Sequence, residues 1–165
     1  MNVNTSHSRS ALMARVKGKN TGPEILVRKR LHSLGARFRL HQKKLPGSPD
    51  VVLASRKLVI FVHGCFWHRH SGCKRTTTPK TRTEFWEGKF AANLLRDKRN
   101  IECLENQGWS VQVIWECETR NDADLTKRLQ RMLDDHSMSG SLGSEGCQKD
   151  STRCQNHANC SECST

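Results

Sequence analysis

The chain has 165 residues, and its 28 Lys and Arg against 16 Asp and Glu give a net charge of +12. This length suits one domain with a tail, no apolar run approaches the ~20 residues of a membrane helix, and the polar N-terminus lacks the apolar core of a signal peptide. We therefore expect a cytoplasmic protein whose eight Cys bind metal or stay reduced. The excess positive charge predicts an anionic partner, with nucleic acid favoured over a merely basic soluble protein.

The first predicted element is a helix that begins at Gly22. Thr21 is a suitable N-cap, Pro23 occupies an early helical position that needs no backbone N–H, and Gly35 ends the apolar pattern. Basic and apolar side chains then alternate over residues 37–40, which predicts a short strand.

Two strands are predicted in the middle of the chain, over residues 50–53 and 58–62, after a turn rich in proline and glycine. The second is a continuous apolar run, which is typical of a central strand buried on both faces. A long helical pattern covers residues 81–107, and the apolar side chains near one of its faces are Phe90, Leu94, Ile101 and Leu104.

A third strand over residues 109–115 and an amphipathic helix carrying Leu125, Leu129 and Leu133 complete the order of elements. Helix, strands, helix, strand and helix together indicate a small α/β domain, because strands that alternate with helices build a sheet with helices packed on it. We assign residues 1–135 to this domain.

Residues 136–165 differ in composition from the rest of the chain. They are rich in Ser and Gly, contain no aromatic residue and carry a net charge of −1, so residues 1–135 carry +13. Such a composition cannot offset the entropy of ordering the chain, and we expect a disordered tail. Its four Cys, among them the Cys160 and Cys163 pair, could form a second zinc site or remain reduced thiols. Cys103 lies among apolar residues and is expected in the core.

The strongest chemical signal is the segment HGCFWHRHSGC at residues 63–73, which holds two Cys and three His. Structural zinc takes four Cys or His ligands, and short loops often supply them in pairs. Cys65, His70 and Cys73 could provide three ligands, and Cys117, just past the predicted third strand, is a candidate for the fourth. The alternative is a set of buried thiols and surface imidazoles.

A second signal joins Asp50, at a strand start, with His63, at the end of the next predicted strand. A carboxylate suits Mg²⁺, which prefers oxygen ligands and keeps several waters. A nearby imidazole can move the leaving-group proton when a phosphodiester is hydrolysed. Taken alone, an Asp that follows Pro49 is equally well explained as a turn residue.

Aromatic side chains form a third group. Phe66 and Trp67 are adjacent, and Trp86 begins the long predicted helix among basic residues. Aromatic side chains in such surroundings can wedge between base pairs. Packing in the core is the commoner use of an aromatic residue, and we expect it for Trp109 and Trp115.

Four segments together resemble the very short patch repair (Vsr) endonucleases, a bacterial family of DNA mismatch endonucleases. They span about residues 9–118 and read RSALMARVKGKNTGPEILVRKRLHSLG, LPGSPDVVL, VIFVHGCFWHRHSGC and KTRTEFWEGKFAANLLRDKRNIECLENQGWSVQVIWECE. The resemblance implies a restriction-endonuclease-like α/β core, in which helices flank a mixed central sheet, with a structural zinc site. It also implies Mg²⁺-dependent nicking on the 5′ side of the mispaired T in T:G mismatches. These mismatches arise when 5-methylcytosine deaminates, and the nick initiates very short patch repair.

The resemblance assigns roles to individual residues. Asp50 matches the Mg²⁺-binding carboxylate, and Val62, which stands where the best-known pattern has Thr, offers its main-chain carbonyl to the same site. Glu24 matches an acidic group near the metal. His63 and His68 match the catalytic histidines.

Two further sets follow from the same resemblance. The implied zinc ligands are Cys65, His70, Cys73 and Cys117. The implied wedge beside the mismatch consists of Phe66, Trp67 and Trp86, together with Met13, which inserts from the other groove.

Two other classes of function remain open from the residues alone. A non-catalytic zinc module that binds damaged DNA would use the same charge and aromatic side chains but would leave Asp50 and His63 without a role. A thiol redox protein would not explain the charge of +13 on residues 1–135. The expected partner is double-stranded DNA containing a T:G mismatch, bound in the cytoplasm by a nucleoid-associated monomer. Mismatch-repair proteins are further candidate partners, and a membrane is not.

Overall fold

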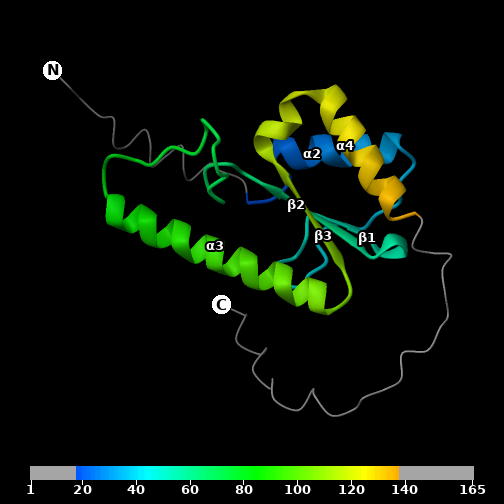
Figure 1. Cartoon of the computed structure of the whole chain (residues 1–165), viewed down its shortest axis with the longest axis horizontal. Coiled ribbons are helices and arrows are strands. Elements are labelled where there is room, and N and C mark those ends of the chain that lie inside the picture. Colours follow the sequence, from blue (N-terminus) through cyan, green and yellow to red (C-terminus); the bar gives the residue numbers. More distant parts are fainter. Residues whose placement is uncertain (1–17, 138–165) are drawn as a thin grey trace, which may run out of the picture.

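The computed structural model describes residues 18–137, and its centre is a three-stranded sheet (Figure 1). The strands are β1 (Val51–Leu53), β2 (Leu58–His63) and β3 (Ser110–Trp115), in the spatial order β1-β2-β3. The pairing of β1 with β2 is antiparallel and that of β2 with β3 is parallel, so the sheet is mixed. The predicted α/β class, with a mixed sheet and the apolar run as its central strand, is confirmed.

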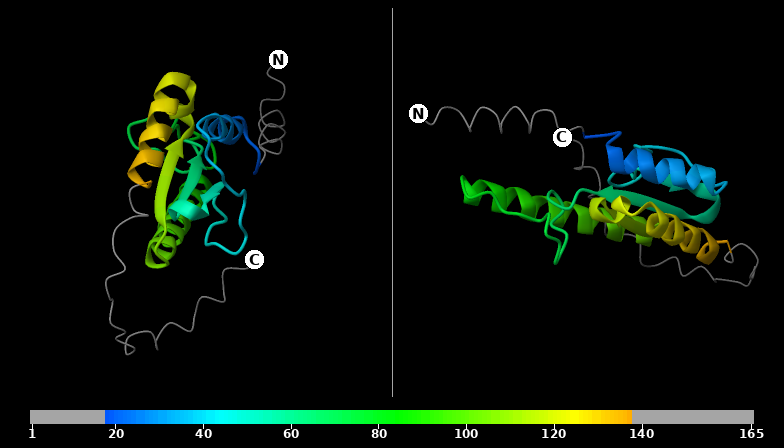
Figure 2. Two further views of the ribbon diagram at one scale, coloured as in Figure 1. Left: turned by 90° about the vertical axis from the view of Figure 1, so that its right-hand side faces the viewer. Right: turned by 90° about the horizontal axis from the view of Figure 1, so that it is seen from above.

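Helices pack on both faces of this sheet (Figures 1 and 2). Helices α2 (Gly22–Ser33) and α4 (Asp122–Asp135) cover one face, and the long helix α3 (Thr83–Asn106) lies against the other. Side chains alternate between the two faces of a strand, and they build two separate apolar clusters here. On the α2 and α4 face these include Val27, Leu31, Ile60, Ile114 and Leu129; on the α3 face they include Val52, Val59, Phe61 and Leu104.

The start of α2 follows directly from its sequence. The Thr21 side chain accepts a hydrogen bond from the Glu24 N–H, the Glu24 carboxylate accepts one from the Thr21 N–H, and Pro23 stands in the first turn. This reciprocal capping satisfies backbone donors that have no partner inside the helix. Gly35 follows the helix in the left-handed conformation, with φ +74°, which costs glycine little.

Two short 3₁₀ segments connect the elements around the sheet. Segment η1 (Ala54–Arg56) joins β1 to β2, and η2 (Glu116–Arg120) leads from β3 to α4. Asn121 caps α4 by accepting hydrogen bonds from two backbone N–H groups of the first turn. Segment η2 matters for the site described below because it holds the chain immediately after β3.

Residues 37–40 do not form the predicted strand. Arg39 and Val52 exchange two backbone hydrogen bonds of 2.9 and 2.8 Å, but this is an isolated bridge. The physical reason lies just after this bridge, where His41 adopts a left-handed backbone conformation with φ +44° that ends the extended run. An alternation over four residues is too short to hold a strand against such a turn.

The apolar face predicted for α3 is only partly buried. Phe90 and Leu104 are buried as expected, but Leu94 is 46% exposed, and its neighbour Leu95 is 60% exposed. A helix of 24 residues extends ~36 Å, whereas strands of six residues extend ~20 Å. The sheet is therefore too short to cover the whole helix. Cys103, expected in the core, is half-buried.

Several sequence-based expectations lie outside the described residues. These are the placement of Met13 and of the four Cys beyond residue 137. Within residues 18–137, no helix combines the length and the apolar character that crossing a membrane requires.

Candidate active site and metal centre

Asp50 lies where the chain enters β1, directly after the buried Pro49. Its Oδ2 accepts a hydrogen bond of 2.8 Å from the N–H of Val62, near the end of the neighbouring strand β2. Burial raises the pKa of Asp50 above its ordinary value, the hydrogen bond from Val62 opposes this, and repulsion from the Glu24 carboxylate adds to it. Burial is therefore the dominant cause of this shift.

Glu24 supplies the second carboxylate from the first turn of α2. Its side chain is buried, and besides capping the helix it accepts hydrogen bonds from the Asn20 N–H at 2.9 Å and the Thr21 hydroxyl at 2.8 Å. Arg28, one helical turn later, forms an ion pair with Glu24 at 2.7 Å. Because a buried carboxylate is costly without partners, these contacts explain how Glu24 stays buried.

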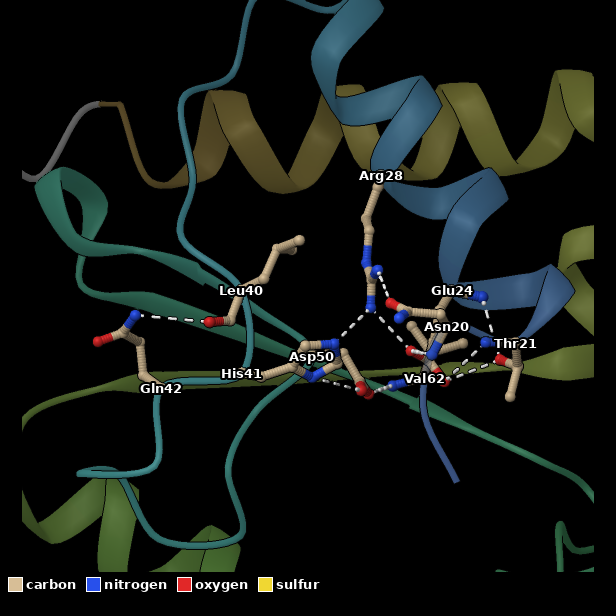
Figure 3. A network of polar contacts seen from close by, with 9 residues as sticks. All are labelled: Asn20, Thr21, Glu24, Arg28, Leu40, His41, Gln42, Asp50 and Val62. Carbon is tan, nitrogen blue, oxygen red and sulfur yellow. Dashed lines mark hydrogen bonds and ion pairs between the residues drawn. The ribbon is translucent and has the colours of Figure 1, made fainter. Parts of the chain in front are cut away.

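Arg28 and His41 lie between these two carboxylates (Figure 3). Arg28 Nη2, which contacts Glu24, is also 3.0 Å from His41 Nε2, and the other side of the imidazole, Nδ1, is 3.9 Å from Asp50 Oδ1. One chain of polar contacts thus runs from α2 through the His41 turn to the start of β1.

His63 and His68 form a second group at the end of β2. Their rings are stacked, with centroids 3.8 Å apart and planes 10° apart. His68 Nδ1 also contacts Asp97 Oδ2, from α3, at 2.5 Å. Burial and the neighbouring His68 lower the pKa of His63 to about 4, so His63 is neutral at pH 7. Burial alone would raise the pKa of Asp97, but the hydrogen bond with His68 and the nearby charges outweigh it and leave that pKa lowered.

A cavity of about 430 Å³ opens beside the histidine pair, between α3 and β3. His63, His68 and Asp97 line it together with apolar side chains that include Ile101, Val113 and Trp115. The pair is therefore accessible from this side, although His63 itself is buried. Since Val62 and His63 are consecutive in β2, their side chains face opposite sides of the sheet, and the carboxylate and histidine groups approach the strand end from different faces.

The four residues predicted to bind zinc come together. One ligand atom from each of Cys65, His70, Cys73 and Cys117 lies within 4.8 Å of the others, and His70 Nδ1 is 3.3 Å from the Cys117 sulfur. Three sulfurs and one imidazole nitrogen are a usual donor set of structural zinc, so these residues fit the ion. Burial and the neighbouring thiols raise the pKa of Cys117 to about 12.

The sheet explains this convergence. Cys65 follows β2, and Cys117 lies in η2 directly after β3. Because β2 and β3 are parallel neighbours, with His63 paired to Trp115, their C-terminal ends lie side by side. Trp115 also stacks on His70, with centroids 4.2 Å apart, so it supports a candidate ligand in addition to packing beside the sheet.

The predicted wedge residues form one aromatic cluster. Phe66 packs edge to face against Trp67, Trp86 and Phe90, with centroid separations of 5.1 to 5.6 Å. Phe66, Trp67 and Trp86 are half-buried, and Phe85 beside them is 51% exposed. The cluster joins the Cys-rich loop to the first turns of α3 and is partly exposed to solvent.

The chain is similar in sequence to several known proteins. Residues 1–75 match the family model described as DNA mismatch endonuclease Vsr. The chain is 37% identical over 149 residues to the DNA mismatch endonuclease Vsr of Escherichia coli K12, covering 87% of this chain and 95% of that protein. It is 52% identical over 126 residues to the type II nicking enzyme V.XorIIP of Xanthomonas oryzae, covering 76% and 92%. A third relative, the type II nicking enzyme V.NmeAIP of Neisseria meningitidis, is 44% identical over 129 residues, covering 78% and 91%. The chain belongs to the Vsr family of DNA mismatch endonucleases.

Membership in the Vsr family makes the chain a nuclease that acts on DNA, and its relatives support a DNA nicking endonuclease. The anionic partner that the positive net charge predicted is therefore DNA. Membership in a nuclease family excludes the two alternative functions, a non-catalytic binding module and a thiol redox protein. A nuclease of this family also implies a divalent metal, for which the carboxylates and the Cys and His cluster offer ligands.

Sequence reasoning missed three residues that contact the candidate site of this Vsr-family chain. Asp97 had a signal, because it stands between Phe90 and Leu104 on the apolar face of α3, where an unpaired charge is unusual. Arg28 had a weaker one, since it follows Glu24 by four residues on the same helix. His41 had none, because only the turn after the Arg39 bridge brings it to Asp50.

Proposed function

We propose that the chain is a Mg²⁺-dependent nicking endonuclease that cuts 5′ of the mispaired T in T:G mismatches arising from 5-methylcytosine deamination, and so initiates very short patch repair. One observation carries the proposal most strongly. A carboxylate group and a histidine group, which can both take part in metal-assisted hydrolysis of a phosphodiester, lie at the C-terminal end of the same strand, β2.

Asp50 and the main-chain carbonyl of Val62 would hold the Mg²⁺, with Glu24 as an acidic group near it. Both offer oxygen, which this ion prefers, and because burial raises the pKa of Asp50, a cation beside it would favour its charged form. The bound ion would neutralise charge on the scissile phosphate and activate the attacking water. The protein holds both carboxylates in place. The first turn of α2 fixes Glu24, and the N–H of Val62 fixes Asp50.

His63 and His68 would manage the proton of the leaving group. Asp97 contacts His68 at Nδ1, which leaves the other ring nitrogen of His68 for proton transfer. The Asp97 carboxylate would also stabilise positive charge on His68 during the reaction. His63, neutral at pH 7, packs its ring against His68 and fixes its orientation. In this proposal Asp97 is a positioning residue, because it acts through His68.

The aromatic cluster would recognise the mismatch. Phe66, Trp67 and Trp86, with Met13 from outside the described residues, would insert beside the T:G pair, which is cheaper to deform than a matched pair. Zinc bound by Cys65 and the other three ligands would be structural, since it would anchor both ends of the loop that carries Phe66 and Trp67.

The remaining expectations are also proposals. We infer that the protein acts as a monomer in the cytoplasm, where it associates with the nucleoid, and that mismatch-repair proteins are additional partners. Residues 1–135 would form the endonuclease domain, followed by a tail over residues 136–165.

The test is a nicking assay on duplexes that differ in a single base pair. A T:G duplex, with the mismatched strand labelled at its 5′ end, is incubated with full-length protein with and without Mg²⁺, beside the matched duplex. We expect one nick, 5′ of the mispaired T, that requires Mg²⁺ and is lost in Asp50→Ala. Equal nicking of the matched duplex would overturn the specificity, and full activity of folded Asp50→Ala would overturn the metal assignment.

A further inference from the structure

His41 links a helix to the candidate metal-binding carboxylate, yet no motif marks it. Its Nε2 is 3.0 Å from Arg28 Nη2, and its Nδ1 is 3.9 Å from Asp50 Oδ1 (Figure 3). The side chains of His41, Asp50 and Arg28 are 21%, 20% and 12% exposed. These contacts are therefore largely shielded from water, and charges and dipoles act more strongly there than at the surface.

The contact with Arg28 determines which nitrogen of His41 carries the proton. A guanidinium group has N–H donors and no acceptor, so His41 Nε2 must accept the hydrogen bond from Arg28. A neutral imidazole has a single N–H, and in this arrangement it sits on Nδ1, the nitrogen that faces Asp50. Arg28 thus selects the tautomer that turns a donor toward the carboxylate.

Arg28 is itself held in place. Its Nη2 contacts Glu24 Oε2 at 2.7 Å, and its Nη1 donates to Asn20 Oδ1 at 2.6 Å. Its Nε is buried without a hydrogen-bond partner in the described part of the chain. A guanidinium fixed at two points, despite this unsatisfied donor, has little freedom to turn away from His41.

Each oxygen of the Asp50 carboxylate faces a different partner. Val62 donates to Oδ2 at 2.8 Å, a full hydrogen bond, whereas His41 Nδ1 faces Oδ1 from 3.9 Å. The second distance is too long for a hydrogen bond, so His41 attracts Oδ1 without occupying it. The backbone of His41, at φ +44°, is in a left-handed conformation that is unfavourable for a non-glycine residue, and such strain concentrates at functional sites.

We propose that His41 is a positioning residue that orients Asp50 for the catalytic divalent ion, and that Arg28 sets the tautomer in which it does so. This inference rests on the proposed role of Asp50 as a ligand of that ion. It adds two residues to the site, and both of them would act through Asp50.

Two substitutions test the two ring nitrogens of His41 separately. The amide nitrogen of Asn lies near the place of imidazole Nδ1, so His41→Asn keeps a donor toward Asp50. Gln reaches the place of Nε2, so His41→Gln keeps an acceptor toward Arg28 but has no donor toward Asp50. The matched control is His32→Gln, an exposed position in the last turn of α2.

The first measurement is the affinity of the full-length, zinc-loaded chain for Mn²⁺, from the electron paramagnetic resonance of free Mn²⁺. We expect a loss of about tenfold in His41→Gln, at most threefold in His41→Asn and none in His32→Gln, where tenfold corresponds to ~1.4 kcal/mol. The Mg²⁺ concentration for half-maximal nicking should shift in the same order. Equal losses in His41→Gln and His41→Asn, or none in either, would overturn the proposal.

The second measurement is the tautomer of His41 in ¹⁵N-histidine-labelled chain without Mg²⁺, with the signal assigned by its absence in His41→Asn. We expect the proton on Nδ1, and a proton on Nε2 would refute the role of Arg28. A wild-type chain that binds Mn²⁺ in an Asp50-dependent way but does not nick the T:G duplex would refute the proposed function alone. A wild-type chain without Asp50-dependent Mn²⁺ binding would overturn the positioning role.

Discussion

Replacing Asp97 tests whether the carboxylate behind His68 contributes to the reaction. In the structure its Oδ2 is 2.5 Å from His68 Nδ1, and the Asp97 side chain is only 14% exposed. Asp97→Asn keeps an oxygen that can accept a hydrogen bond from Nδ1 but removes the charge, and Asp97→Ala removes both. The two variants therefore divide the contact into its electrostatic and its hydrogen-bonding parts.

The size of the effect follows from the burial of this pair. A hydrogen bond to a charged group contributes ~1.5–3 kcal/mol net, and each 1.36 kcal/mol in the activation free energy is a factor of ten in rate. We expect the nicking rate to fall about tenfold in Asp97→Asn and about a hundredfold in Asp97→Ala. The assay is single-turnover nicking of the T:G duplex with protein in excess, which excludes product release from the measured rate.

Glu102→Gln is the matched control, because Glu102 lies on the same helix and its ion pair with Lys98, at 3.8 Å, is exposed. Such a surface pair contributes ~0–1 kcal/mol to stability, and this variant should nick at the wild-type rate. A folded Asp97→Ala protein with the rate of Glu102→Gln would refute the reasoning and leave His68 without need of a carboxylate.

Three further predictions concern stability and metal. The raised pKa of Asp50 means that the folded chain holds this proton more tightly than the unfolded chain, so stability without Mg²⁺ falls as the pH rises above the ordinary value of 3.8. Asp50→Asn should therefore raise the unfolding temperature of the zinc-loaded chain in Mg²⁺-free buffer at pH 7.5, and a lower unfolding temperature would contradict this. Cys73→Ser should release the one zinc ion expected per chain, measured by atomic absorption, whereas Cys103→Ser should retain it. Leu129→Ala, which empties a fully buried position, should lower the free energy of unfolding in urea by about 2–5 kcal/mol, while the exposed Leu95→Ala should change it by less than ~0.5 kcal/mol.

The elements predicted correctly from the sequence are those whose signals are local. The cap at Thr21 and the apolar run that became β2 each determine their structure within a few residues. The prediction of a strand over residues 37–40 was wrong for the opposite reason. Whether this strand forms depends on the backbone conformation of His41, which the alternation of side chains does not indicate. Exposure of Leu94 likewise depends on how far the sheet extends under α3, a property of three strands together.

The same difference between local and non-local signals applies to the site residues. The Cys and His cluster could be predicted because its ligands are dense in sequence and only Cys117 is remote. The partners of Asp50 and His68 could not be specified, since His41 and Asp97 reach them from other elements. A family resemblance carries over residues that touch metal or DNA, and it names fewer of the residues that hold those groups in place.

The register of β2 connects all of these groups. Val62 and His63 are consecutive, so the strand presents its backbone to Asp50 and its next side chain to His68, and the zinc loop begins two residues later at Cys65. A shift of one residue would exchange the two faces of the strand and place an imidazole in the apolar cluster under α2 and α4. Because β2 is the central strand, and its Ile60 packs in that cluster, such a shift would also expose several apolar side chains. The same burial that stabilises the fold therefore keeps the carboxylate, histidine and zinc groups aligned.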